Sequence, residues 1–391
     1  MLSQKNLVVI LCGLFLVMAG FGITLPVLPF YIKNLSQAQG ISSENLWLHV
    51  GLITGIYPFM QFLFSPYLGS LSDELGRRPL ILWGLAGYSI SMFLFSLSVG
   101  ILLLYVFRLM AGISSAAFFI ASSAYVADNT STDKRGRGMS LLISVASLGV
   151  VAGPLIGNLF SRVDITIGQF TIDRYSLPFS ISAIFVLLVC VFLFFSLKES
   201  YNSRHHEIID TRKKEKKSIF IISKSVKKSF LLLLFVSFIS QLSLAMFEGT
   251  FALHSQRLFQ FDVKQMGFVF MVCGSVMGLL QLGPVAWLIK WKGERALLPY
   301  GLLILGIGMS LLMLSSEIGV ILFFVSIVSV GMAILTPCLA SLVTKESGDN
   351  YGTSLGIYSS VNSLGQMLGI ISGSVMMIWF VHLPYFIISI V

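Results

Sequence analysis

The chain has 391 residues, of which 56% are hydrophobic and 11% are charged, and its mean hydropathy is +0.90. A water-soluble domain carries about 25% charged residues, so this composition excludes that class and predicts a chain surrounded by lipid. The formal net charge of +9 could indicate nucleic-acid binding. However, the basic residues lie in loops beside apolar stretches, which membrane topology explains, and we expect no nucleic-acid partner.

Successive apolar stretches are long enough to cross a membrane, because a spanning helix needs about 20 apolar residues. The first stretch follows Lys5, and its length, its prolines Pro26 and Pro29 and the lack of a cleavage site favour a span over a signal peptide. In chain order, the predicted spans are 7–32, 48–68, 80–99, 101–127, 138–160, 177–197, 230–254, 266–289, 296–314, 318–344 and 352–380.

The polar segment 198–229 divides these spans into an N-terminal bundle, residues 1–197, and a C-terminal bundle, residues 230–391. Its basic run from Arg212 to Lys217 predicts either a solvated linker or an amphipathic stretch on anionic lipid. Most Lys and Arg residues of the loops fall on the same side as this segment. The positive-inside rule therefore places the linker and the N-terminus in the cytoplasm.

An internal repeat predicts two copies of one six-helix unit. At a constant offset, three glycines of the fifth span recur in the eleventh: Gly149, Gly153 and Gly157 correspond to Gly365, Gly369 and Gly373. Pro178 opens the sixth span and corresponds to Pro384, after which the chain ends at Val391. We therefore expect a truncated last helix. Either the sequence is a truncated copy, or the protein naturally lacks most of this helix.

The first short loop between spans is rich in polar residues. It reads Gly69-Ser70-Leu71-Ser72-Asp73-Glu74-Leu75-Gly76-Arg77-Arg78-Pro79. This pattern resembles the loop signature of the major facilitator superfamily, which joins the second and third helices. The resemblance implies an all-α membrane protein with the major facilitator fold of two six-helix bundles. It also implies a secondary transporter that is not an enzyme and needs no cofactor.

The same resemblance implies a conformational latch on the cytoplasmic side. Asp73 would face the beginning of the eleventh helix near 352–355, where a carboxylate meets the positive end of the helix dipole. Arg77 would reach Asp128, and Gly69 and Gly76 would shape the loop between them. Alternatively, these charges only fix a cytoplasmic turn. The second copy of the loop, from Gly283 to Arg295, reads as degraded.

The fifth span contains Gly149-x-x-x-Gly153-Pro154-x-x-Gly157. Together with Gly20 and Gly22 in the first span and Arg108 and Gly112 in the fourth, it resembles the signatures of drug:proton antiporters. The glycines permit close helix contact and Pro154 bends the helix, so an ordinary packing face is the alternative. The resemblance implies export across a bacterial inner membrane.

Two charged residues stand out inside predicted spans, where charges are costly and persist mainly for function: Arg108 and Glu248. The segment from Ala245 to Phe251 resembles the matching helix of bacterial quinolone and multidrug efflux pumps, which implies that Glu248 couples transport to protons. Burial in apolar surroundings favours the neutral carboxyl group, so Glu248 could bind a proton on one side and release it on the other. The alternative is a neutral, hydrogen-bonding core residue.

Arg108 keeps its proton, so we expect it to orient polar groups or water; the alternative is a snorkelling anchor. Gln61, Gln281 and Gln366 resemble cavity-lining positions of the same pumps, or else they form hydrogen bonds between helices. Aromatic residues beside them would suit a flat hydrophobic cation. These are Tyr57, Phe118, Phe247, Phe251 and Tyr358.

The chain also departs from the quinolone pumps. Ala333 and Thr336 stand where those pumps have an acid and an arginine, which leaves the proton stoichiometry open. The four cysteines fall inside spans and suggest neither a disulfide nor a metal site.

We expect a monomer in contact with membrane lipid that exchanges protons for an amphipathic compound by alternating access. The alternatives are an exporter of one endogenous metabolite, such as a siderophore or a sugar, and a transport-inactive membrane protein that binds a ligand.

Overall fold

The structure is a computed structural model that describes residues 4–38, 46–129, 132–161, 165–167, 170–199, 228–312, 314, 317–346, 351–379, 384 and 386–387. Apart from a hairpin of β1 (Ile165–Ile167) and β2 (Phe170–Ile172), the regular elements of this part are helices. Within it, eight helices are long and apolar enough to cross a membrane, or nine if one bent pair is a single span. The predicted all-α membrane fold is confirmed.

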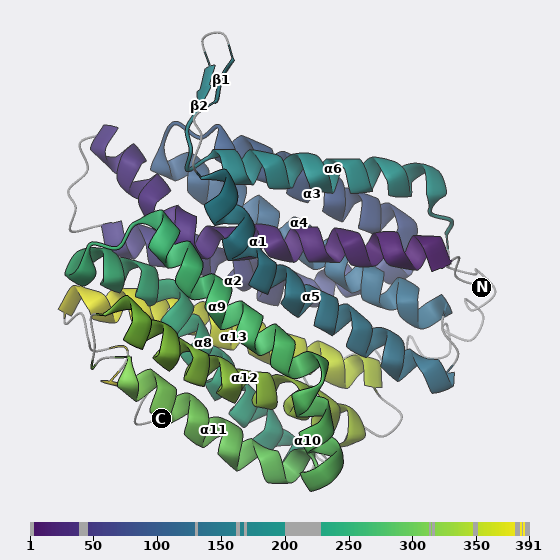
Figure 1. Ribbon diagram of the computed structural model, residues 1–391. Helices are drawn as coiled ribbons and strands as arrows, with labels where there is room; N and C mark the ends of the chain where they lie inside the picture. Colours follow the sequence, from purple (N-terminus) through teal and green to yellow (C-terminus); the bar gives the residue numbers. More distant parts are fainter. Residues whose placement is uncertain are drawn as a thin grey trace.

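The helices before residue 200 pack mainly on one another (Figure 1). They are α1 (Gln4–Ala38), α2 (Leu46–Leu75), α3 (Arg77–Ser96), α4 (Ile101–Asn129), α5 (Thr132–Phe160) and α6 (Leu177–Ser196). In this group, α1 packs on α5 and α6, α3 on α4 and α6, and α2 on α4. We call the end of the bundle at which α2 meets α3 the Arg77 end.

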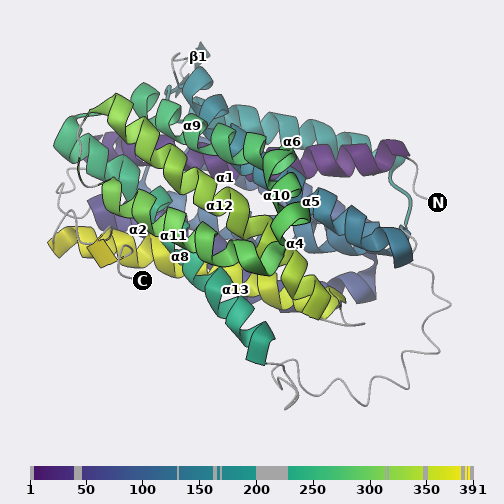
Figure 2. The same cartoon turned by 60° about the horizontal axis from the view of Figure 1, so that its bottom comes forward.

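The remaining helices form a second group, which lies against the first through α2 with α13 and α5 with α9 (Figure 2). They are α8 (Lys228–Phe259), α9 (Val263–Leu282), α10 (Pro284–Lys292), α11 (Glu294–Leu311), α12 (Ile318–Glu346) and α13 (Tyr351–Trp379). The predicted linker, apart from its ends, and the predicted truncated last helix lie largely outside the described residues. The division at 198–229 therefore stays a prediction.

The predicted span 266–289 is not one straight helix. The structure breaks it into α9 and α10, which meet at an angle of 47° around Gly283. Pro284 begins α10, and its ring lacks a backbone N–H and clashes with the preceding turn of a continuous helix. The predicted span therefore corresponds to a bent pair of helices.

The loop signature is also more helical than a polar turn. α2 continues through Asp73 to Leu75, α3 begins at Arg77, and the connection is Gly76 with a φ of 96°. Residues that carry a Cβ atom rarely adopt such a φ, so glycine is needed where the chain reverses. Pro79 falls in the first turn of α3, which tolerates a missing N–H.

The repeated glycines form equivalent helix contacts in the two groups. A Cβ atom on Gly153 of α5 would lie 2.5 Å from the Cα atom of Gly22 in α1. A Cβ atom on Gly369 of α13 would lie 3.0 Å from the backbone nitrogen of Met246 in α8. The glycines therefore serve helix packing in both copies, as the packing-face interpretation states.

Gly153→Ala is expected to destabilise the protein, because the new methyl group forces α1 and α5 apart. Overpacking of this kind costs about 1–3 kcal/mol. Gly306→Ala in α11 is the matched control, because a Cβ atom there meets nothing within 4 Å. Thermal unfolding in detergent, followed by the reaction of a thiol dye with the buried Cys190, Cys273 and Cys338, measures the effect. Equal melting temperatures for the two variants would contradict it.

Candidate functional site

Three residues of α4 face α2 at helical spacing: Arg108, Gly112 and Ser115. A Cβ atom on Gly112 would lie 2.7 Å from the carbonyl oxygen of Tyr57, so glycine lets α4 approach α2 closely. Further along the same contact, Gln61 Nε2 donates a hydrogen bond of 3.0 Å to Ser115 Oγ. Gln61 thus makes the hydrogen bond between helices that one of its two interpretations predicts.

Arg108 is fully buried, and its guanidinium carbon lies 4.6 Å from the ring centroid of Tyr57 and 5.6 Å from that of Phe21. Among the residues that the structure describes, none of its three side-chain nitrogens has a hydrogen-bond partner. Contacts with ring faces contribute about 0.5–2 kcal/mol, whereas burying an ion costs several kcal/mol. The rings therefore do not compensate the charge. Full burial also excludes the snorkelling-anchor interpretation.

Glu248 of α8 is 9% exposed. Its helix neighbours Phe247 and Phe251 have ring centroids 5.0 Å apart, and the ring of Phe270 of α9 joins them at 5.9 and 6.1 Å. The structure thus places a buried carboxyl group on a helix segment that carries two rings of an aromatic cluster. Phe270 was not predicted, since nothing in its local sequence separates it from the other phenylalanines of the chain.

The other predicted cavity residues do not join one cluster. Tyr358 hydrogen-bonds with Ser237 and Asn362, at the contact of α8 with α13. Phe118 is fully buried, and its ring tip lies near Gly13 of α1, so its ring fills a helix contact. Gln281 is partly buried, and its Nε2 has no hydrogen-bond partner among the described residues. Gln366 is also partly buried.

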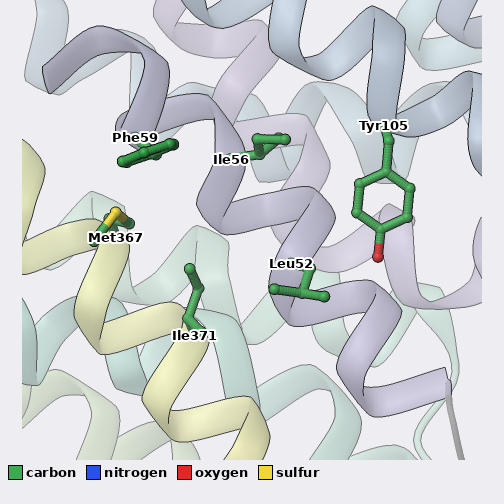
Figure 3. Close-up of a pocket in the computed structure, with 6 residues that line it drawn as sticks. All are labelled: Leu52, Ile56, Phe59, Tyr105, Met367 and Ile371. Carbon is green, nitrogen blue, oxygen red and sulfur yellow. The ribbon is translucent and has the colours of Figure 1, made fainter. Parts of the chain in front are cut away.

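A separate apolar cavity of about 280 Å³ lies between α2 and α13 (Figure 3). Its lining residues are Leu52, Ile56, Phe59, Tyr105, Met367 and Ile371. The Tyr105 hydroxyl group lies 3.0 Å from His49 Nδ1. None of the predicted cavity residues lines this space. Sequence patterns could not find it, because ordinary residues of three helices, α2, α4 and α13, create it.

The guanidinium group of Arg77 connects three helices. Its Nη1 donates to Asp73 Oδ1 of α2 at 2.6 Å, and its Nε donates to Asp128 Oδ2 of α4 at 3.0 Å. The Arg77 side chain is 10% exposed. These contacts lie within the first helix group, so the pairing of Arg77 with Asp128 does not join the two groups as expected. The predicted contact of Asp73 with 352–355 concerns side chains outside the described residues, and the latch stays a prediction.

Glu199 completes this cluster and was missed by the sequence analysis. Its carboxylate accepts hydrogen bonds from the backbone N–H groups of Arg77 at 3.0 Å and Arg78 at 3.1 Å. A carboxylate at the beginning of a helix satisfies free N–H groups and complements the helix dipole. A Cβ atom on Gly76 would lie 2.7 Å from Glu199 Oε2, so a side chain here would displace this carboxylate in addition to straining φ.

The second copy of the loop is altered rather than degraded. Gly293 has a φ of 80° and precedes α11, as Gly76 precedes α3. Glu294 then pairs with Lys345 of α12 at 2.6 Å and accepts a hydrogen bond of 2.7 Å from Ser341. The positions match Arg77 and Asp128 at a constant offset, but the signs of the charges are reversed. Beside this pair, Arg295 contacts Glu346.

Helices that cross a membrane repeatedly, with a buried cation in one helix group and a buried carboxyl group in the other, define a multi-pass membrane protein of the transporter class. The sequence matches the Major Facilitator Superfamily over residues 10–370. The chain therefore belongs to the Major Facilitator Superfamily.

Curated relatives span nearly the whole chain at low identity. Multidrug resistance protein 2 of Bacillus subtilis is 24% identical and covers 98% of this chain and 92% of its own. The class D tetracycline resistance protein of Salmonella ordonez is 30% identical and covers 90% and 84%. A quinolone resistance protein of Staphylococcus aureus is 21% identical and covers 94% and 88%. The predicted similarity to bacterial multidrug and quinolone efflux pumps is confirmed.

Solved structures share the fold. The human organic anion transporter MFSD10 matches with a TM-score of 0.72 at 24% identity, over 100% of this chain and 97% of its own. A bacterial homologue of the human lysosomal transporter Spinster, in an inward-facing and unoccupied conformation, matches with a TM-score of 0.67 at 13% identity, over 99% and 98%. These likenesses establish the fold alone.

Gly76→Ala is expected to lower the melting temperature more than Gly293→Ala. Both positions have a φ that disfavours side chains, which costs about 1–3 kcal/mol. Only the methyl group at position 76 would also meet the Glu199 carboxylate, because a Cβ atom on Gly293 has nothing within 4 Å. Thermal unfolding of the two variants in the same detergent makes the comparison. A larger loss for Gly293→Ala would contradict the described role of Glu199.

Asp128→Asn is expected to destabilise the protein more than Lys345→Gln. The first change weakens a charged hydrogen bond to the nearly buried Arg77, and such bonds contribute about 1.5–3 kcal/mol. The second removes an ion pair whose lysine side chain is 62% exposed, and exposed pairs contribute about 0.2–1 kcal/mol. Melting temperatures at low and high salt measure both effects. Salt should reduce only the difference between wild type and Lys345→Gln.

Proposed function

We propose that this protein is a proton-coupled secondary transporter that exports amphipathic small molecules across a bacterial inner membrane. Membership in the superfamily supports transport, and the multidrug and tetracycline resistance proteins among its relatives support export of such compounds. In this proposal the Arg77 end and the N-terminus face the cytoplasm, because basic residues flank the helices there.

The observation that carries the proposal is the burial of Glu248, a carboxyl group inside α8 about three turns before its end. A carboxylate in such surroundings is costly unless it has a task. Neutral Glu248 binds no cation, whereas ionised Glu248 attracts the cationic group of a substrate. Proton binding from outside therefore displaces the substrate, and proton release inside restores the substrate site.

Alternating access requires that the two helix groups move relative to each other. The contacts of α2 with α13 and of α5 with α9 are the seams along which this movement would occur. In the proposed cycle these seams open and close in turn on the two sides of the membrane, while each helix group keeps its own packing. The charged clusters around Arg77 and Glu294 hold helix ends together within each group during that movement.

Glu248→Gln is expected to abolish gradient-driven transport. The amide matches the neutral carboxyl group in shape but cannot release a proton, so the cycle has no coupling step. In inverted membrane vesicles with an acidic interior, uptake of a fluorescent lipophilic cation should occur with wild type and fall at least tenfold with the variant. Glu317→Gln is the matched control, because this acid is exposed before the beginning of α12.

Equal gradient-driven uptake by wild type and Glu248→Gln would overturn the coupling role of Glu248. Uptake that persists after a protonophore collapses the gradient would overturn proton coupling altogether. Wild-type vesicles that take up neither this dye nor other amphipathic probes would contradict the proposed range of substrates.

A further inference from the structure

The charge of Arg108 has no acidic partner in the helices around it. The helices packed on α4 are α1, α2, α3 and α5. In these helices and in α4 itself, the sequence places acids only at the Arg77 end: Asp73, Glu74, Asp128 and Asp133. Asp128 follows Arg108 by twenty positions of the same helix, which corresponds to about 30 Å. No intramolecular carboxylate of this group can therefore compensate the guanidinium group.

The surroundings of Arg108 match one kind of ligand. A guanidinium group presents a planar fork of N–H donors, which fits both oxygens of a carboxylate. Here all three side-chain nitrogens lack hydrogen-bond partners in the described part of the chain, although the side chain is fully buried. The rings of Tyr57 and Phe21, whose centroids are 5.2 Å apart, lie against the same group and offer apolar contact. The site therefore suits an anionic group attached to an apolar, aromatic body.

Arg108 and Glu248 both lie inside their helices rather than at helix ends. Arg108 is about two turns after the beginning of α4, and Glu248 is about three turns before the end of α8. Both of these helix ends lie away from the Arg77 end, and α8 contacts α1 and α2, which carry Phe21 and Tyr57. One molecule could thus present an anionic group to the first helix group and a cationic group to the second.

We propose that Arg108 is the binding site for a carboxylate of the transported molecule, so that the substrates include amphipathic acids and zwitterions. This inference rests on the proposed function. Because Arg108 is covered in this conformation, the carboxylate reaches it when Tyr57 and Phe21 separate from the guanidinium group. Without substrate, the buried guanidinium charge is uncompensated and destabilises the protein. The substrate carboxylate neutralises this charge when it binds.

The test uses two fluorescent dyes that differ in one group: a rhodamine with a free carboxylate and the methyl ester of the same dye. Fluorescence anisotropy of each dye is titrated with the purified full-length protein, without a proton gradient. Arg108→Met should weaken binding of the acid at least tenfold and binding of the ester less than twofold. Arg108→Lys keeps the charge but loses the planar fork, so it should bind the acid with intermediate affinity.

A second measurement separates binding from a structural role. Without ligand, Arg108→Met should unfold at a temperature equal to or above that of wild type, because it removes a buried charge that has no partner. The acid dye should raise the melting temperature of wild type but not that of Arg108→Met. A structural arginine would instead give a variant that unfolds at a lower temperature and binds both dyes less well.

The inference is overturned if wild type does not bind the acid, or if Arg108→Met changes the affinities for acid and ester equally. The titrations require no transport, so their outcome is independent of the vesicle assay. Acid binding through Arg108 without gradient-driven uptake would retain the inference and reject the proposed function. Gradient-driven uptake together with an unchanged affinity of Arg108→Met for the acid would retain the proposed function and reject the inference.

Discussion

The cost of placing charge in an apolar medium governs this molecule more than any other constraint. The long apolar helices leave very few positions where a charge is tolerated, and the two that stand out, Arg108 and Glu248, lie in different helix groups. Other charges gather at helix ends, where they satisfy free backbone groups and one another. Function and stability are thus separated in space: buried charges form the candidate site, and clusters at the helix ends hold the helices together.

Close helix contact is the second determinant, and it depends on glycine in both copies of the repeat. Gly153 brings α5 against α1, and Gly369 brings α13 against α8. Gly112 acts in the same way between α4 and α2, and it thereby brings Arg108 over the ring of Tyr57. The geometry of the candidate site therefore follows from backbone packing several residues away from the charges themselves.

Hydropathy and spacing were sufficient to predict the helices and the repeat, because long apolar stretches and glycine patterns are local signals, and the family followed from the resemblance of the loop and glycine motifs. They failed where distant or single residues decide the structure. Gly283 and Pro284 break a stretch that is mostly apolar, and Glu199 caps a helix that begins 122 positions earlier. The candidate site was predicted as a set of residue types. Which side chains meet, such as Phe247 and Phe270, depends on helix packing that no local pattern encodes.

The opposite polarity of the two loop ion pairs has a consequence for folding. A duplicated chain contains similar helices that could dock in each other's places while it folds. If α3 docked on α12, Arg77 would meet Lys345, and if α11 docked on α4, Glu294 would meet Asp128. Each wrong pairing would bring like charges together at a helix end. The reversed signs thus disfavour wrong helix pairing by like-charge repulsion, so each repeat assembles with its own helices.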